Sequence, residues 1–148
     1  MNDLRFDGQV ALVTGAGRGL GRAHARLLAA RGCTVVINDL GSAFDGTGAA
    51  TGRVADEVVA RIQAEGGKAT ANYDSVENGQ AIIDDVMATH GRLDIVINNA
   101  GILTPEVWSE LTLESWQRTL NVNLTGVFSV MKAAWPVFVA QQYGRCIV

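Results

Sequence analysis

The chain has 148 residues, of which 48% are hydrophobic, 18% are charged and 17 are glycine. This composition is typical of a folded α/β protein and argues against a disordered or fibrous chain. A compact fold of this length buries about 70% of the surface that its unfolded form exposes. We therefore predict one domain over residues 1–148.

Charge and hydropathy argue against several classes of partner. The net charge is −3 and the pI is about 5.3, with Lys and Arg scattered along the chain, so we expect no nucleic-acid partner. The first residues lack the pattern of a signal peptide, and no apolar run approaches the roughly 18 residues of a membrane span. We expect a cytoplasmic protein without a membrane partner.

Five short apolar segments alternate with longer segments of helical periodicity. This alternation predicts βαβ units around a parallel sheet, and hence an α/β, doubly wound fold with helices on both faces. The predicted strands are residues 10–13, 33–37, 68–72, 93–97 and 145–148. The strand order expected for such a unit is 3-2-1-4-5.

Four helices are predicted between these strands. The first is expected to bury Leu20, Ala23, Leu27 and Leu28, which recur at helical spacing. The second and third are expected to end at Gly66-Gly67 and at Gly91. Thr112 is expected to cap a long last helix that reaches residues 143–144, with Pro136 as a candidate for a bend.

A glycine-rich turn links the first predicted strand to the first predicted helix. Residues 14–21 read TGAGRGLG, with glycine at positions 15, 19 and 21. Cβ atoms there would hold the backbone amides away from a phosphate, whereas glycines let the helix amino end face a diphosphate. The strand before the turn and the helix after it predict a dinucleotide-binding Rossmann unit.

An acid follows this turn at the end of the second predicted strand. Asp39 lies near the spacing at which a carboxylate accepts hydrogen bonds from the adenosine ribose hydroxyls, and it would repel a 2′-phosphate. Arg18 favours the opposite cofactor, NADP, because a guanidinium in the turn could pair with such a phosphate. We predict NAD over NADP. Residues 41–52 are expected to form a surface loop beside this edge.

Two motifs together resemble the short-chain dehydrogenase/reductase family: Thr14-Gly15-x-x-x-Gly19-x-Gly21 and, after the fourth strand, Asn98-Asn99-Ala100-Gly101. The resemblance extends over essentially the whole chain. Residues 37–41, 72–76 and 134–135 are most similar to the (3R)-hydroxyacyl-CoA dehydrogenase unit of peroxisomal multifunctional enzymes.

The resemblance implies roles for particular residues. Asp74 would bind the adenine amino group, residues 98–101 would line the cofactor ribose, and Asn123 would be the active-site asparagine near a water on the proton relay. From the residues alone, Asp74 is interpreted as an acid in a helix N-cap region, a role compatible with adenine binding, and the Asn98-Asn99 pair as buried groups that satisfy the backbone. The predicted cofactor-binding residues are Thr14, Gly15, Gly17, Arg18, Gly19, Leu20, Gly21, Asp39, Asp74, Ser75, Asn99, Ala100 and Gly101.

The family's proton-transfer residues are not found in the chain. In the family, a Ser after the fifth strand orients the substrate and the Tyr of a YxxxK motif moves the proton, whereas neither Tyr73 nor Tyr143 has a Lys four positions on. We therefore expect the amino-terminal part of a dehydrogenase, with a sheet incomplete on its C-terminal side. Such a fragment would bind cofactor without turnover and would associate or dissolve poorly.

The predicted function is hydride transfer between a nicotinamide cofactor and a secondary alcohol or ketone, resembling a 3-hydroxyacyl-CoA or a hydroxysteroid. The alternative is a non-catalytic NAD-binding or interaction module. By analogy with the family, the full-length protein would form a homo-oligomer through the helix at 112–142.

Other candidate groups are expected to have no catalytic role. We interpret the acidic pairs at 56–57 and 84–85 as solvated surface, and His24 and His90 as isolated residues. Cys33 and Cys146 lack CxxC spacing and a nearby His, so we predict reduced core thiols and no metal site.

Overall fold

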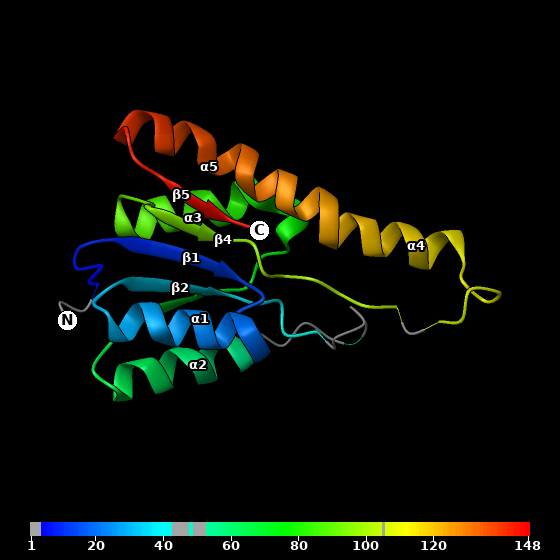
Figure 1. The fold of residues 1–148 in the computed structure, drawn as a ribbon, viewed down its shortest axis with the longest axis horizontal. Coiled ribbons are helices and arrows are strands. Elements are labelled where there is room, and N and C mark those ends of the chain that lie inside the picture. Colours follow the sequence, from blue (N-terminus) through cyan, green and yellow to red (C-terminus); the bar gives the residue numbers. More distant parts are fainter. Residues whose placement is uncertain (1–3, 43–47, 49–52, 105) are drawn as a thin grey trace.

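A computed structural model describes residues 4–42, 48, 53–104 and 106–148. Five parallel strands form one sheet in the order β3-β2-β1-β4-β5, which confirms the predicted topology (Figure 1). The chain crosses from β3 at one edge back to β4 beside β1, so the strand order reverses between β1 and β4. The strands are β1 (Val10–Thr14), β2 (Thr34–Asn38), β3 (Lys68–Asn72), β4 (Ile95–Ile97) and β5 (Arg145–Ile147).

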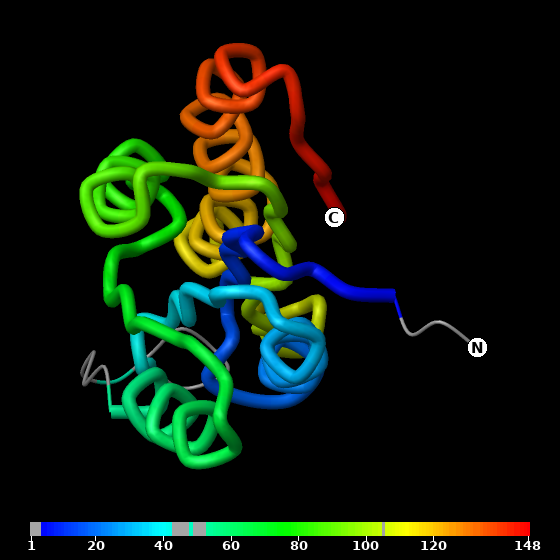
Figure 2. Tube along the Cα trace, turned by 90° about the vertical axis from the view of Figure 1, so that its left-hand side faces the viewer, coloured from blue at the N-terminus to red at the C-terminus, as the bar shows by residue number. Residues whose placement is uncertain are grey.

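Helices cover both faces of the sheet, as predicted (Figures 1 and 2). One face carries α1 (Gly19–Ala30) and α2 (Arg53–Ala64). The other carries α3 (Gly79–His90) and α5 (Val127–Gln141), which pack against each other. A short 3-10 turn, η1 (Val76–Asn78), precedes α3, and α4 (Leu113–Leu120) joins α5 through a π-helical turn, η2 (Asn121–Gly126).

The core has two halves because side chains alternate along each strand. On β1, Ala11 and Val13 point into the half beneath α1 and α2, whereas Val10 and Leu12 point into the half beneath α3 and α5. All five residues of β1 are buried, as expected for a central parallel strand. The carboxyl end of β1 is therefore held from both faces.

The prediction of which residues of α1 are buried is largely wrong. Leu20, Ala23 and Leu27 are not buried, and the exposed fractions are 72% for Leu20 and 54% for Leu27. Small residues face the sheet because they let the helix axis approach the strands closely, and only Leu28 of the predicted set joins them. The buried residues are Gly21, Ala25, Leu28 and Ala29.

The predicted helix ends agree with the backbone. Gly66 and Gly91 have φ angles of 83° and 70°, the left-handed conformation that ends a helix at little cost for glycine. Thr112 caps α4 by accepting from the amide of Ser115, whose hydroxyl in turn accepts from the amide of Thr112. The long helix stops at Gln142, which has a φ of 54°, one residue before the predicted turn.

The long helix is also the one described segment that length and composition would allow to cross a membrane. It runs over 29 residues, Leu113–Gln141, and reaches a mean hydropathy of 1.3 without being continuously apolar. The sequence-based expectation that nothing approaches such a length was therefore too strong. Here one side of α5 lies in the core, through Val130, Ala133, Ala134 and Phe138.

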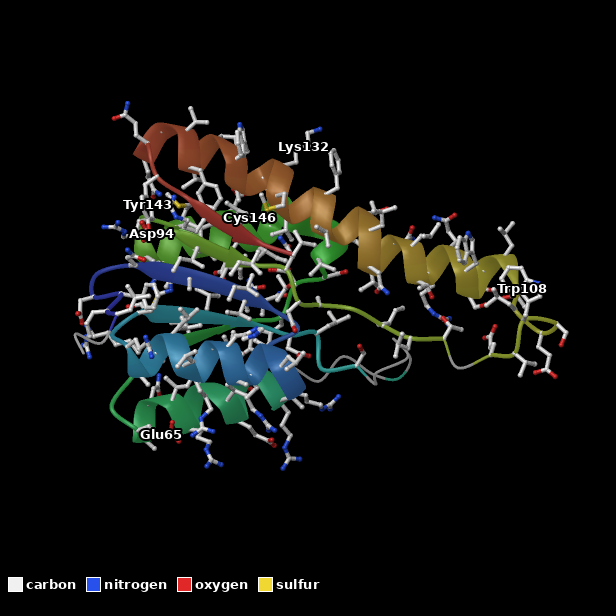
Figure 3. All side chains as sticks on the ribbon, in the orientation of Figure 1. Glu65, Asp94, Trp108, Lys132, Tyr143 and Cys146 are labelled. Carbon is white, nitrogen blue, oxygen red and sulfur yellow. The ribbon has the colours of Figure 1, made fainter. Side chains whose placement is uncertain are left out.

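The two cysteines differ in their environments. Cys33 is buried, and burial raises the pKa of its thiol to about 12, as a core thiol requires. Cys146 is exposed, contrary to the prediction of a core thiol, because β5 is the edge strand of the sheet and all of its residues are exposed (Figure 3). The predicted loop at 41–52 falls mostly outside the described residues.

A buried acid joins the central strands at the end opposite the phosphate turn. Asp94 accepts hydrogen bonds of 2.8 Å from the amide of Val10 and from Nε and Nη2 of Arg92. Its backbone oxygen accepts from the amide of Arg145. One residue thus connects the starts of β1, β4 and β5, and its charge is paired as burial requires.

His90 gives the fold a pH dependence. Its Nε2 lies 3.0 Å from the Thr70 hydroxyl, and burial lowers the pKa of the imidazole from its usual 6.5. The unfolded chain then binds more protons than the folded chain below pH 6.5, so the free energy of unfolding falls as the pH falls through that window. We expect urea unfolding at pH 7, 6 and 5 to show this decrease and His90→Gln to reduce it. An equal decrease in the variant would contradict this role for His90.

Candidate cofactor-binding site

The glycine turn lies where β1 gives way to α1. Gly15 has a φ of 61°, and a Cβ placed on it would lie 2.7 Å from Cα of Ala100. Gly15 is therefore required both by its backbone conformation and by the close approach of the chain after β4. Gly19, with a φ of 51°, begins α1, so the free amides of the helix amino end face outward from the sheet edge.

Thr14 and Asn99 lock this turn to the end of β4. The Asn99 side-chain amide donates to the carbonyl oxygens of Thr14 and Gly15, both at 3.0 Å. The Thr14 hydroxyl accepts from the amides of Asn99 and Ala100, at 3.1 and 3.0 Å. Thr14 itself is buried, so its role here is to position the turn. Gly21 faces the same Asn99 side chain, whose amide nitrogen would lie 2.5 Å from a Cβ placed on Gly21.

Asp39 is held at the end of β2 by the turn itself. Its two carboxylate oxygens accept hydrogen bonds of 2.8 Å, one from the amide of Gly17 and one from the amide of Gly41. A Cβ on Gly17 would lie 2.7 Å from the Asp39 carboxylate and from the Val54 side chain. Gly17 therefore allows the Asp39 carboxylate to occupy this position, because any side chain at residue 17 would displace the carboxylate. Each carboxylate oxygen keeps a lone pair for a further donor.

Arg18 lies beside this acid and is exposed. Its guanidinium donates to the backbone oxygen of Ser42 at 3.1 Å, and within the described part of the chain it forms no ion pair with Asp39. A cation and an anion therefore border the same part of the site, and they favour different cofactors. The position of the carboxylate, fixed by two amides, is the more constrained of the two.

Asp74 lies at the end of β3 in a network of amide side chains. Asn72 donates to the Asp74 carboxylate at 3.0 Å and to that of Asp85 at 2.8 Å. Asn38 donates to the Asp74 carbonyl oxygen at 2.9 Å, and the Ser75 side chain caps η1 by accepting from a backbone amide of that turn. Asp85, predicted to be only solvated surface, thus has a structural partner.

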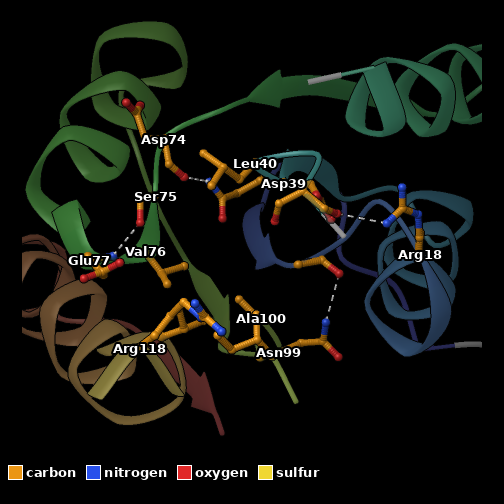
Figure 4. Close-up of a pocket in the computed structure, with 16 residues that line it drawn as sticks. Arg18, Asp39, Leu40, Asp74, Ser75, Val76, Glu77, Asn99, Ala100 and Arg118 are labelled. Carbon is orange, nitrogen blue, oxygen red and sulfur yellow. Dashed lines mark hydrogen bonds between the residues drawn. The ribbon is translucent and has the colours of Figure 1, made fainter. Parts of the chain in front are cut away.

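These groups surround one cavity of about 330 Å³ at the carboxyl ends of the strands (Figure 4). Such a crevice, at the point where strand order reverses, is the usual ligand site of an open α/β sheet. Of the predicted residues, those that line it are Gly15, Arg18, Asp39, Asp74, Ser75, Asn99, Ala100 and Gly101. Thr14, Gly17, Gly19, Leu20 and Gly21 do not line it.

Half of the cavity lining was not predicted from the sequence. These residues are Asn38, Leu40, Ser42, Val76, Glu77, Ile102, Arg118 and Val122. Six of them end a strand or lie within five residues after β2, β3 or β4, a signal that could have been used. Arg118 and Val122 carry no such signal, because only the packing of α4 and η2 brings them to the cavity.

Asn123 lies in the π-helical turn rather than in a regular helix. Its side-chain amide forms both hydrogen bonds with the backbone of Ile102, accepting from the amide at 2.8 Å and donating to the carbonyl at 3.0 Å. The side chain therefore fastens the helix to the segment that follows β4. π-Helical turns frequently mark functional sites, because they interrupt the regular backbone ladder.

The described residues contain no metal cluster, and the environment of Tyr73 does not suit proton transfer. No group of three His, Cys, Asp or Glu side chains is placed to hold a metal ion in the described ranges. The Tyr73 hydroxyl donates to Asp56, and this hydrogen bond raises the pKa of the phenol. A general acid acting near neutral pH needs the opposite shift.

Comparison with known proteins identifies relatives. The chain is 50% identical over 145 residues to the peroxisomal multifunctional enzyme type 2 of Mus musculus, covering 98% of the chain and 20% of that protein. It resembles the structure of the full-length enzyme of that name from Drosophila melanogaster, with a TM-score of 0.75 and 37% identity, over 97% of the chain and 22% of that structure.

A second solved structure that resembles the chain comes from a shorter protein. A metagenomic short-chain oxidoreductase, solved in complex with NADP, matches with a TM-score of 0.83 and 30% identity, over 95% of the chain and 61% of that structure. The chain thus spans less than two thirds of each of these proteins. The family model described as short chain dehydrogenase matches residues 9–148, and the chain therefore belongs to the short-chain dehydrogenase family.

Proposed function

We propose that this chain forms the NAD-binding part of an oxidoreductase that acts on a secondary alcohol or ketone. The observation that carries the proposal is the Asp39 carboxylate, fixed by the amides of Gly17 and Gly41 at the border of the strand-end cavity. An adenosine ribose placed there would donate its hydroxyls to this carboxylate. When bound, the nicotinamide supplies the hydride chemistry.

The residues present fit a dinucleotide along the whole cavity. The amino end of α1 and the cradle at Gly15 would take the diphosphate, because the backbone approaches there without side chains. Asp74 and Ser75, at the far end of the same cavity, would border the adenine. Ala100 and Gly101 supply small surfaces where a second ribose would pass.

NAD is proposed over NADP for an electrostatic reason. A 2′-phosphate would place a second anion against Asp39, and Arg18 would offset only part of that repulsion because it is exposed. The NADP of the metagenomic relative indicates that the same fold accepts the other cofactor, so local residues decide. NADP therefore stays the alternative cofactor.

We propose a 3-hydroxyacyl-CoA as the substrate. The resemblance of residues 37–41, 72–76 and 134–135 to (3R)-hydroxyacyl-CoA dehydrogenase units favours a 3-hydroxyacyl-CoA over a hydroxysteroid, and several residues after β4, including Ile102, border the cavity. The 148 residues contain no YxxxK motif, so we expect them to bind NAD without turnover. Detectable NAD reduction with a secondary alcohol would contradict that expectation.

A cytoplasmic location is still a prediction, whereas several relatives are peroxisomal by name.

The apolar stripe on the long helix supports self-association. Trp116, Leu124, Phe128 and Trp135 are between 46% and 64% exposed on α4, η2 and α5. An apolar face of this kind on one helix suits an isologous contact with a second copy. We propose that the protein is a homo-oligomer through this helix.

Calorimetry with NAD and NADP tests the cofactor preference. We expect NAD to bind about ten- to a hundred-fold more tightly than NADP, as one close like-charge contact at the surface of a protein requires. Asp39→Ala should reduce this ratio mainly by strengthening NADP binding, and Arg18→Met should increase it. Tighter binding of NADP by the unaltered chain would show that Arg18 outweighs Asp39.

Gly17→Ala tests whether the turn positions the acid. The added methyl would displace Asp39, so we expect NAD binding to weaken about ten-fold or more and stability to fall by about 1–3 kcal/mol, as for other overpacked sites. Gly66→Ala is the control, because no atom lies within 4 Å of its Cβ position and it is remote from the cavity. It should lower the melting temperature and leave NAD binding unchanged. Equal NAD affinities in both variants would argue against this role of Gly17.

Phe128→Glu tests the proposed oligomer. Light scattering should find the unaltered chain as a dimer or larger assembly and the variant as a smaller species, because a charge on the contact would remain desolvated. Leu4→Glu is a matched control, since Leu4 is 63% exposed and Phe128 is 62% exposed. The control should leave the assembly unchanged. A monomer for the unaltered chain would refute the proposal.

A further inference from the structure

The cavity contains a second arginine that the glycine turn and the family motifs do not predict. Arg118 comes from α4, and Val122 follows it by four residues, so the two lie on the same side of the helix. Both line the cavity together with Val76 and Ala100 (Figure 4). Arg118 and Leu40 lie on opposite sides of this space in the figure, and Asp74 and Ser75 lie at its edge.

Arg118 has an unsatisfied donor at this position. Its Nε is buried and has no hydrogen-bond partner in the part of the chain that the structure describes. A buried donor without a partner is unfavourable, and at Nε no described residue fixes the guanidinium in place. The guanidinium also borders the cavity, where a ligand can contact its planar face, and such a contact leaves Nε without an acceptor.

The surroundings indicate which part of a dinucleotide would meet this guanidinium. The diphosphate position belongs to the turn at Gly15 and Gly19, next to Arg18, whereas Arg118 lies at the Val76 and Asp74 end of the cavity. Leu40, Val76 and Val122 supply apolar surface at that end, and the acids Asp74 and Glu77 there would repel a phosphate, so the end suits a flat ring. A guanidinium plane is the cation that stacks best on an aromatic face.

We propose that Arg118 binds the adenine ring of the dinucleotide by stacking its guanidinium on one face, with Leu40 on the other. The proposal rests on the proposed function, because it requires the dinucleotide to occupy this cavity. Arg118 would add affinity without distinguishing NAD from NADP, since the 2′-position faces Asp39 and Arg18. The two arginines thus have separate roles, one at the phosphate end and one at the base.

The test compares AMP with nicotinamide mononucleotide, which share a ribose 5′-phosphate and differ in the base. We expect Arg118→Met to weaken binding of AMP and of NAD roughly ten-fold, the size of a desolvated cation–π contact, and to change binding of nicotinamide mononucleotide less than about two-fold. Lys132→Met is the control, because it removes one positive charge from α5, where Lys132 is exposed and lies over the Phe128 ring. It should leave all three affinities unchanged.

A measurement on the unaltered chain makes the test independent of how well the variant folds. The Nε–Hε NMR signal of Arg118, assigned by through-bond correlations in the unaltered chain, should move upfield when AMP is added, because a stacked ring shields it. Three results would overturn the role of Arg118 and leave the proposed function unaffected. They are an AMP affinity that the variant does not change, equal weakening of both nucleotides, and an NMR signal that does not move. Failure of the unaltered chain to bind NAD would overturn the proposed function as well.

Discussion

The site depends on how closely the carboxyl ends of β1 and β4 approach each other. Asn99 and Thr14 exchange hydrogen bonds that satisfy the carbonyls of Thr14 and Gly15 and the amides of Asn99 and Ala100. Gly15 permits this approach because a Cβ would contact Ala100. A parallel sheet leaves polar backbone groups unpaired at this edge, and here two side chains satisfy them within the protein.

The hydrogen bonds between Thr14 and Asn99 also distinguish residues that position the turn from residues that border the cavity. Thr14, Gly17 and Gly21 do not line the cavity, and they bond to, or leave space for, Asp39 and Asn99, which do line it. Asn123 plays a comparable part on the other side, because its amide holds the π-helical turn to Ile102. The motif therefore includes both residues that line the cavity and residues behind them.

Charge is distributed unevenly around the cavity. Asp39 and Arg18 lie at one end, where an acid fixed by two amides competes with an exposed cation. Asp74 and Arg118 lie at the other end, Asp74 in a network with the side chains of Asn38 and Asn72, and Arg118 beside Val76. Because an exposed charge is screened by water and salt more than a buried one, the two arginines differ in what they contribute to binding.

Local sequence was enough to predict the helix ends at Gly91 and Thr112 and the glycine turn with its acid, because these features follow from local backbone conformation. The strand order was predicted from the fold class that the alternating elements indicate. Packing between distant segments determined which face of α1 is buried, the exposure of Cys146 at a sheet edge, and the arrival of Arg118 at the cavity. No local pattern specifies such contacts, because many helix rotations satisfy the same periodicity.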